Sequence, residues 1–228
     1  NSMISPLSKL QFKGVLWYQG ESNTGRSHEY EALLSSMITD WRSKLNNSTL
    51  PFFIIQLPNF MQTHTYPSES GWAQLREAQR LVTTKLPNTA LVVGLGLGEW
   101  NDIHPLNKKE LAKRVALQAD RLAYNQEKNV SSGPVCISAK LEDGKIALTF
   151  QKGTDDFLPV DSLEGFAIAD KDGRYQWAKA QISGNKILIW NENIANPTMI
   201  RYAWDDNPKG NLRNKASLPA SPFQIKVE

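Results

Sequence analysis

The sequence has little of several features that mark other classes of protein. It contains one cysteine, Cys136, so it cannot form an internal disulfide bond. No apolar run approaches the roughly 20 residues that a membrane-spanning helix needs, so no membrane span is expected. Lysine and arginine are scattered along the chain and the net charge is only +3, which gives nucleic-acid binding little support.

Motifs for metals and nucleotides are also missing. The three histidines show neither i,i+4 nor HExxH spacing, so we predict no metal site. Gly94, Gly96 and Gly98 do not lead into a GxxG turn at a helix start, which argues against a dinucleotide, and we expect no cofactor. The 228 residues, 40% of them hydrophobic and 21% charged, suffice for one large globular domain or two smaller ones.

Apolar residues in the first half of the chain follow two alternating patterns. Short, nearly continuous apolar runs predict strands at 15–18, 52–57 and 90–97. Helical spacing predicts helices at 29–45, 72–86 and 108–124, the first with a buried stripe that includes Tyr30, Leu33 and Leu34. Because strand and helix alternate three times, we predict βαβ units around a parallel sheet and an α/β domain over residues 1–131.

The pattern changes after Ser131-Ser-Gly-Pro134, where helical spacing stops. Asp143-Gly144, Asp172-Gly173 and Ser183-Gly-Asn185 are hairpin signals, and alternating apolar runs lie between them. Short strands at this spacing predict a small antiparallel β-domain over residues 132–228.

Polar residues gather where two of the predicted parallel strands end. Gln19, Gly20, Glu21, Ser22 and Asn23 directly follow the strand at 15–18. Ligands bind at this edge in open α/β sheets, so the cluster is a candidate site. An ordinary polar loop in which Glu21 caps the next helix would have the same composition.

His104 has a matching position, between the strand at 90–97 and the helix at 108–124. A histidine at this edge suits general acid–base chemistry, and a histidine that only caps the helix is the alternative. His28 and His64 lack such a context and are expected at the surface, although His64 lies in a long polar loop that could overhang the site.

Three motifs in order resemble one family. Trp17-Tyr-Gln-Gly-Glu-Ser-Asn23, Asn101-Asp-Ile-His-Pro-Leu-Asn-Lys108 and the C-terminal strings 201–208, 211–214 and 218–223 are similar to blocks of the sialate O-acetylesterases. These are carbohydrate esterases of the SGNH-hydrolase superfamily. The resemblance implies an SGNH/flavodoxin-like three-layer parallel sheet, followed by a β-domain.

The resemblance also implies roles at the site. His104 would be the catalytic histidine and Gln19 an oxyanion-hole donor, with Gly20 or Asn23 as a second donor. Glu21 would hold the loop. Asp102 is a candidate to orient His104. In the SGNH superfamily, however, that carboxylate lies three residues before the histidine, where this sequence has Asn101. A Ser–His dyad is therefore as plausible as a triad with a carboxylate.

One block of the family has no counterpart in this sequence. The nucleophilic serine of the family sits in a GQSNM-like block, which we expect on a segment upstream of residue 1. The chain then resembles the C-terminal portion of a longer esterase, and its sheet would be incomplete on the N-terminal side. Ser22 is a weak substitute because Gly20-Glu-Ser22-Asn-Thr24 is not a GxSxG elbow.

The predicted function is a Ser-His carbohydrate O-acetylesterase that acts on O-acetylated sugars or glycans. A non-catalytic carbohydrate-binding protein that keeps the esterase shell, or an inert fragment, is the alternative. The open side of the sheet suggests a homodimer or an association with the missing N-terminal segment. By resemblance, a periplasmic or extracellular location is expected.

Overall fold

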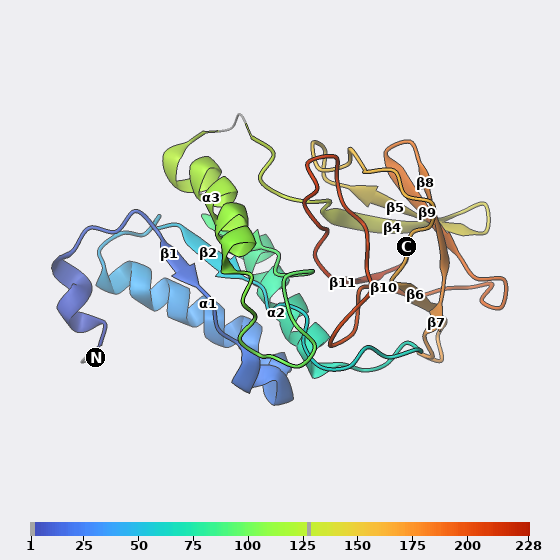
Figure 1. Cartoon of the computed structure of the whole chain (residues 1–228), viewed down its shortest axis with the longest axis horizontal. Coiled ribbons are helices and arrows are strands. Elements are labelled where there is room, and N and C mark those ends of the chain that lie inside the picture. The colour runs from blue at the N-terminus through green and yellow to red at the C-terminus, as the bar shows by residue number, and fades with distance from the viewer. Residues whose placement is uncertain (1–2, 127–128) are drawn as a thin grey trace.

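Two parts of different secondary structure follow one another along the chain (Figure 1). The structure is a computed structural model that describes residues 3–126 and 129–228. Strands and helices alternate up to Tyr124, and every strand from Cys136 onward is antiparallel to its neighbours. The predicted order, a parallel α/β part before an antiparallel β part, is confirmed.

The first part is built on a parallel three-stranded sheet in the order β1-β2-β3. The strands are β1 (Val15–Trp17), β2 (Phe52–Ile55) and β3 (Thr89–Val92), and the helices are α1 (Ser27–Lys44), α2 (Gly71–Lys85) and α3 (Lys108–Tyr124). Short 3-10 helices cover Ser5–Lys9 and Glu21–Arg26. All four residues of β2 are buried, as expected for a central strand covered on both faces.

Helices pack on both faces of this sheet. Phe52 and Ile54 of β2 face a cluster formed with α1 and α2, whereas Phe53 and Ile55 face α3. Leu33 of α1 was predicted to be buried but is 54% exposed, because the buried stripe runs through Tyr30, Leu34 and Ile38 instead.

The predicted strand at 90–97 ends earlier than expected, at Val92. A Cβ atom at Gly94 would lie 2.3 Å from the carbonyl oxygen of Gln56, and Gly96 has a φ of +79°. These two glycines let the chain leave the sheet and turn, although Leu95 and Leu97 remain buried as loop residues.

The second part, predicted as a small antiparallel β-domain, is a sandwich of two four-stranded sheets. The sheets have the orders β4-β5-β9-β8 and β11-β10-β6-β7. Their strands are β4 (Cys136–Glu142), β5 (Lys145–Phe150), β6 (Phe166–Ala169), β7 (Gln176–Trp177), β8 (Lys179–Ser183), β9 (Lys186–Trp190), β10 (Met199–Tyr202) and β11 (Phe223–Lys226). Side chains of both sheets form one apolar core. The three predicted turns join β4 to β5, β6 to β7 and β8 to β9, and the glycine of each has a positive φ.

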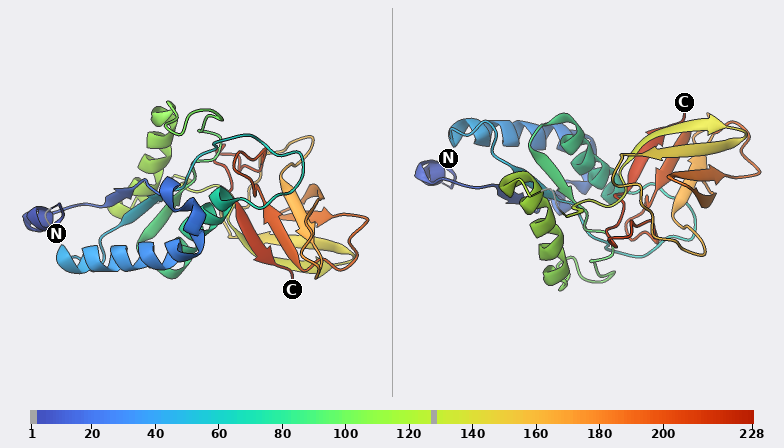
Figure 2. Two further views of the ribbon diagram at one scale, coloured as in Figure 1. Left: turned by 90° about the horizontal axis from the view of Figure 1, so that it is seen from below. Right: turned by 90° about the horizontal axis from the view of Figure 1, so that it is seen from above.

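The α/β part and the sandwich lie beside one another (Figure 2). They are joined by buried polar contacts as well as by the chain. Arg76 of α2 is fully buried and donates to the carbonyl oxygens of Leu57, Pro58, Asp205 and Asp206 at 2.6–2.8 Å. Because two of these acceptors follow β2 and two follow β10, one side chain fixes the end of the parallel sheet against the sandwich. Among the described residues, no helix combines the length and the apolar character required to cross a membrane.

Candidate active site

Three loops lie at the edge of the parallel sheet where its strands end. They follow β1 at 18–26, β2 at 56–70 and β3 at 93–107. Because the strands are parallel, these loops share one edge, which is where open α/β sheets bind ligands. All six predicted site residues lie in the first and third of these loops.

Gln19 is held by hydrogen bonds on both ends of its side chain. Its Nε2 donates to Oδ1 of Asn23 at 2.8 Å, and the hydroxyl of Tyr30 lies 3.0 Å from its Oε1 and 2.8 Å from its carbonyl oxygen. Gln79 of α2 also donates to that carbonyl oxygen, at 3.2 Å. One N–H of Gln19 and the amide N–H groups of Asn23 remain as fixed donors at the sheet edge.

Gly20 occupies a position that only glycine fits. It is buried and has a φ of +154°, and an added Cβ atom would lie 2.4 Å from Cδ2 of Leu75. Its backbone N–H donates to Oε2 of Glu21 at 2.9 Å. Glu21 thus bonds within the loop, and it occupies the N–H that was predicted as a second oxyanion donor.

Asp102 contacts the backbone of His104 and not its imidazole ring. Oδ1 of Asp102 accepts from the backbone N–H of His104 at 2.7 Å. His104 is exposed, and within residues 3–126 and 129–228 its imidazole makes no hydrogen bond or ion pair. In this arrangement Asp102 orients the loop that carries His104, and its predicted action on the imidazole stays a prediction.

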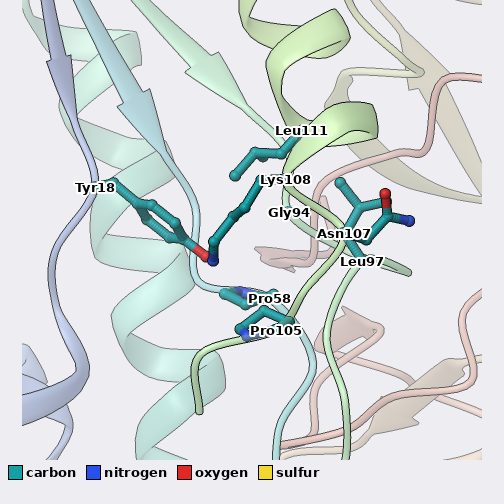
Figure 3. A pocket seen from close by; sticks show the side chains of 8 residues that line it. All are labelled: Tyr18, Pro58, Gly94, Leu97, Pro105, Asn107, Lys108 and Leu111. Atoms are coloured by element: carbon teal, nitrogen blue, oxygen red, sulfur yellow. The ribbon is translucent and has the colours of Figure 1, made fainter. Parts of the chain in front are cut away.

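Tyr18 in the first loop meets Lys108, the residue of α3 that directly follows the third loop (Figure 3). The two side chains point toward one another above Pro58 and Pro105, with Nζ of Lys108 5.3 Å from the centre of the Tyr18 ring. Burial, and secondarily the charge of Glu21, raise the pKa of Tyr18. The cavity between these residues is only about 10 Å³, which leaves room for about one water molecule, so it is a packed contact and not a substrate pocket.

The loop after β2 fixes the loop that carries His104, a link that sequence reasoning missed. Oδ1 of Asn59 accepts from the backbone N–H of Gly96 at 2.6 Å, and a Cβ atom at Gly98 would lie 1.9 Å from the carbonyl oxygen of Asn59. The N–H of Met61 donates to the carbonyl oxygen of Trp100 at 2.9 Å. The sequence feature that could have indicated this link is the pair Pro58-Asn59 at the end of an apolar run.

His64, which was expected at the surface, has a side chain that is 34% exposed and paired with a carboxylate. Its Nδ1 lies 2.6 Å from Oδ1 of Asp205, and its backbone N–H donates to Oδ2 of the same carboxylate at 3.0 Å. The hydrogen bond, and then the charge of Asp205, raise the pKa of His64. His28, by contrast, is exposed, as predicted.

His64, Asp205 and Asp206 also form a group of three potential metal ligands, with their ligand atoms within 4.8 Å of one another. The group already satisfies its own hydrogen bonds, because Asp205 accepts from His64 and the Asp206 backbone, and Asp206 accepts from Ser70 at 2.5 Å. It therefore has an explanation without a metal.

The arrangement can supply part of an acyl-transfer site. Amide donors on Gln19 and Asn23 suit a developing oxyanion, and an exposed imidazole at the same edge suits proton transfer. Ser22, the serine considered as a substitute nucleophile, makes no hydrogen bond to His104 among the described residues.

Comparisons with known proteins agree with the motifs. A family model described as carbohydrate esterase, sialic acid-specific acetylesterase, matches residues 2–121. The sialate O-acetylesterases of Mus musculus and Homo sapiens are each 28% identical, over 100% and 98% of this chain. A crystal structure of a carbohydrate acetylesterase from Xanthomonas citri is 38% identical, with a TM-score of 0.90 over 96% of this chain. The chain spans 47% of the two mammalian proteins and 52% of the Xanthomonas chain, about half of each.

Proposed function

Since the chain belongs to the carbohydrate esterase family of sialic acid-specific acetylesterases, we propose that it carries half of the active site of a carbohydrate O-acetylesterase. The observation that carries this proposal is the Tyr18–Lys108 contact, because it unites the two motif loops at one sheet edge. The proposed substrates are O-acetylated sugars, such as acetylated sialic acids or acetylated plant polysaccharides.

In the proposed mechanism a serine attacks the acetyl carbonyl while His104 accepts the serine's proton. His104 then gives this proton to the leaving sugar oxygen, and water releases acetate from the acyl-enzyme in a second, equivalent step. The amide groups of Gln19 and Asn23 donate to the oxyanion in both steps. This assignment replaces Gly20 as donor, since its N–H is paired with Glu21.

We propose that the serine comes from a segment outside these 228 residues that extends the sheet at β1 into an SGNH-like, three-layer arrangement. Among the residues that the structure describes, β1 pairs only with β2. Leu16 at its centre is 58% exposed because α3 covers β2 and β3. A free, apolar strand edge favours pairing with a further strand. The extra strand could also come from a second copy of the chain, and size-exclusion chromatography with light scattering distinguishes the two.

The test is acetate release from acetylated sugars by the full-length protein. We expect His104→Ala to lower kcat by about a thousandfold or more. His28→Ala is the matched control. His28 is exposed and has no proposed role in catalysis, so this variant should retain activity. Equal rates for both variants would overturn the assignment of His104.

A fluorophosphonate probe tests the nucleophile separately. It labels an activated serine covalently, and peptide mapping then locates the label. We expect it on a serine outside residues 1–228, whereas label on Ser22 would move the nucleophile into this chain. A protein that binds acetylated glycans without releasing acetate or taking up the probe would be the non-catalytic alternative. Fractionation of cells would test the proposed periplasmic or extracellular location.

A further inference from the structure

A second, larger cavity lies between the loop after β2 and the β-sandwich. Its volume is about 380 Å³, within the range of roughly 300–1,000 Å³ that small-molecule sites occupy. Thr63, His64 and Thr65 line one side, and residues of β6, β7 and the segment after β10 line the other. Figure 1 shows the loop reaching toward β7 from the parallel sheet.

Trp177 of β7 gives this cavity an aromatic wall in a fixed orientation. Its indole N–H donates to the carbonyl oxygen of Thr65 at 2.9 Å, while its side chain and backbone together remain 43% exposed. An indole whose polar atom is already bonded presents only its apolar ring to a ligand. Such a ring face matches the C–H face of a pyranose.

His64 supplies a polar group beside this ring. Since Asp205 binds Nδ1 and the backbone N–H of His64, the ring cannot turn, and Nε2 is the atom left for a ligand. The His64 side chain is 34% exposed, whereas that of Asp205 is only 6% exposed. A buried carboxylate thus positions an accessible imidazole, as expected where a protein binds a hydroxyl group.

The remaining charges of the cavity balance one another. Glu164 and Lys209 line the cavity together with the His64–Asp205 pair. A lining with both signs favours neither an anion nor a cation. It suits a neutral ligand with many hydroxyl groups, which can both donate and accept hydrogen bonds.

The same loop contacts the segment that leads to the predicted catalytic histidine. The N–H of Met61 donates to the carbonyl oxygen of Trp100, four residues before His104. Thr63 to Thr65, which line the cavity, follow Met61 by two to four residues. We propose that the cavity is a glycan subsite, in which a neutral pyranose ring stacks on Trp177 and bonds to Nε2 of His64. It holds a sugar unit next to the one that carries the acetyl group. This role rests on the proposed esterase function, but binding itself does not.

The experiment compares two substrates on the full-length protein. We expect Trp177→Ala to lower kcat/KM for acetylated oligosaccharides by about tenfold, mainly through KM, and to leave hydrolysis of 4-nitrophenyl acetate unchanged. Trp177→Phe keeps an aromatic face and should recover most of the loss. Trp190→Ala is the matched control, since Trp190 lies in the other sheet against Lys145 and should behave as wild type.

Calorimetric titration with deacetylated oligosaccharides separates the subsite from the esterase. Binding by the wild type that Trp177→Ala weakens about tenfold supports the subsite even if no acetate is released. Acetate release with equal oligosaccharide KM in wild type and Trp177→Ala would overturn the subsite and leave the esterase intact. Equal loss with both substrates would also overturn it, since it would mean a general structural role for Trp177.

Discussion

Replacing Arg76 with methionine tests how the two parts of the protein are held together. The guanidinium is fully buried and satisfies four backbone carbonyl oxygens, those of Leu57, Pro58, Asp205 and Asp206. Burial lowers its pKa to about 9 against the raising effect of the two aspartates, so it still carries a proton at neutral pH. Methionine fills a similar volume but donates no hydrogen bond.

The expected loss follows from these contacts. Each hydrogen bond from a charged donor contributes about 1.5–3 kcal/mol, and the cost of burying the cation offsets part of the sum. Removing the guanidinium leaves its buried carbonyl acceptors without this donor, and with that offset the net cost is about 3–5 kcal/mol. We expect a loss in this range, which is a large fraction of the stability of a typical domain.

Urea unfolding measures the change, with tryptophan fluorescence and far-ultraviolet circular dichroism as two probes. A loss of about 3–5 kcal/mol lowers the midpoint by about 1–2 M. Arg76→Lys keeps the charge but not the planar fork and should fall between wild type and Arg76→Met. Arg26→Met is the control, because the Arg26 side chain is 68% exposed. If Arg76→Met unfolds within about 0.5 kcal/mol of wild type, the buried guanidinium does not stabilise this junction.

Three further predictions concern local features. Gly20→Ala should lower stability by about 2–4 kcal/mol in thermal unfolding, since its Cβ atom meets Leu75, whereas Gly25→Ala, with open space around it, should not. Burial raises the pKa of Cys136 to about 12, so a disulfide reagent at pH 8 should modify it only in denaturant, and rapid labelling of native protein would contradict this. The pKa of His64 is raised, so its pair with Asp205 should add stability below the unfolded pKa of about 6.5 and lose it as pH rises through the folded value. The effect should be small because His64 is partly exposed, and an unchanged NMR titration of His64 in Asp205→Asn would refute it.

Local signals were sufficient to predict most of the elements. Asn107 caps α3 through Glu110, and Asn125 ends it in a left-handed conformation, so α3 covers the predicted 108–124. The hairpin turns also follow from local chemistry, because Gly144, Gly173 and Gly184 adopt positive φ values. These elements depend on residues a few positions apart, which is the range that a sequence pattern records.

The contacts that shape the site depend on residues far apart in the sequence. His64 and Asp205 are 141 positions apart, and Arg76 and Asp206 are 130 apart. In the sequence, none of these residues can be distinguished from an exposed polar residue, because their contacts form only when the sandwich packs against α2. The two motif loops were predictable because strand order alone places both at one edge, whereas the pairing of Asp102 with a backbone N–H depends on the geometry of the loop.

The β-sandwich therefore has a structural part in the site even though no predicted site residue lies in it. The side chain of Asn59 links the two parts. Its Nδ2 donates to Asn207, which follows β10 of the sandwich, and its Oδ1 accepts from Gly96 in the loop that leads to His104. Removal of the sandwich would release Asn59 on one side and leave Arg76 with two of its four acceptors. The loop that carries His104 is thus positioned from both parts of the chain, and a site built in this way requires the sandwich for its geometry as well as for its stability.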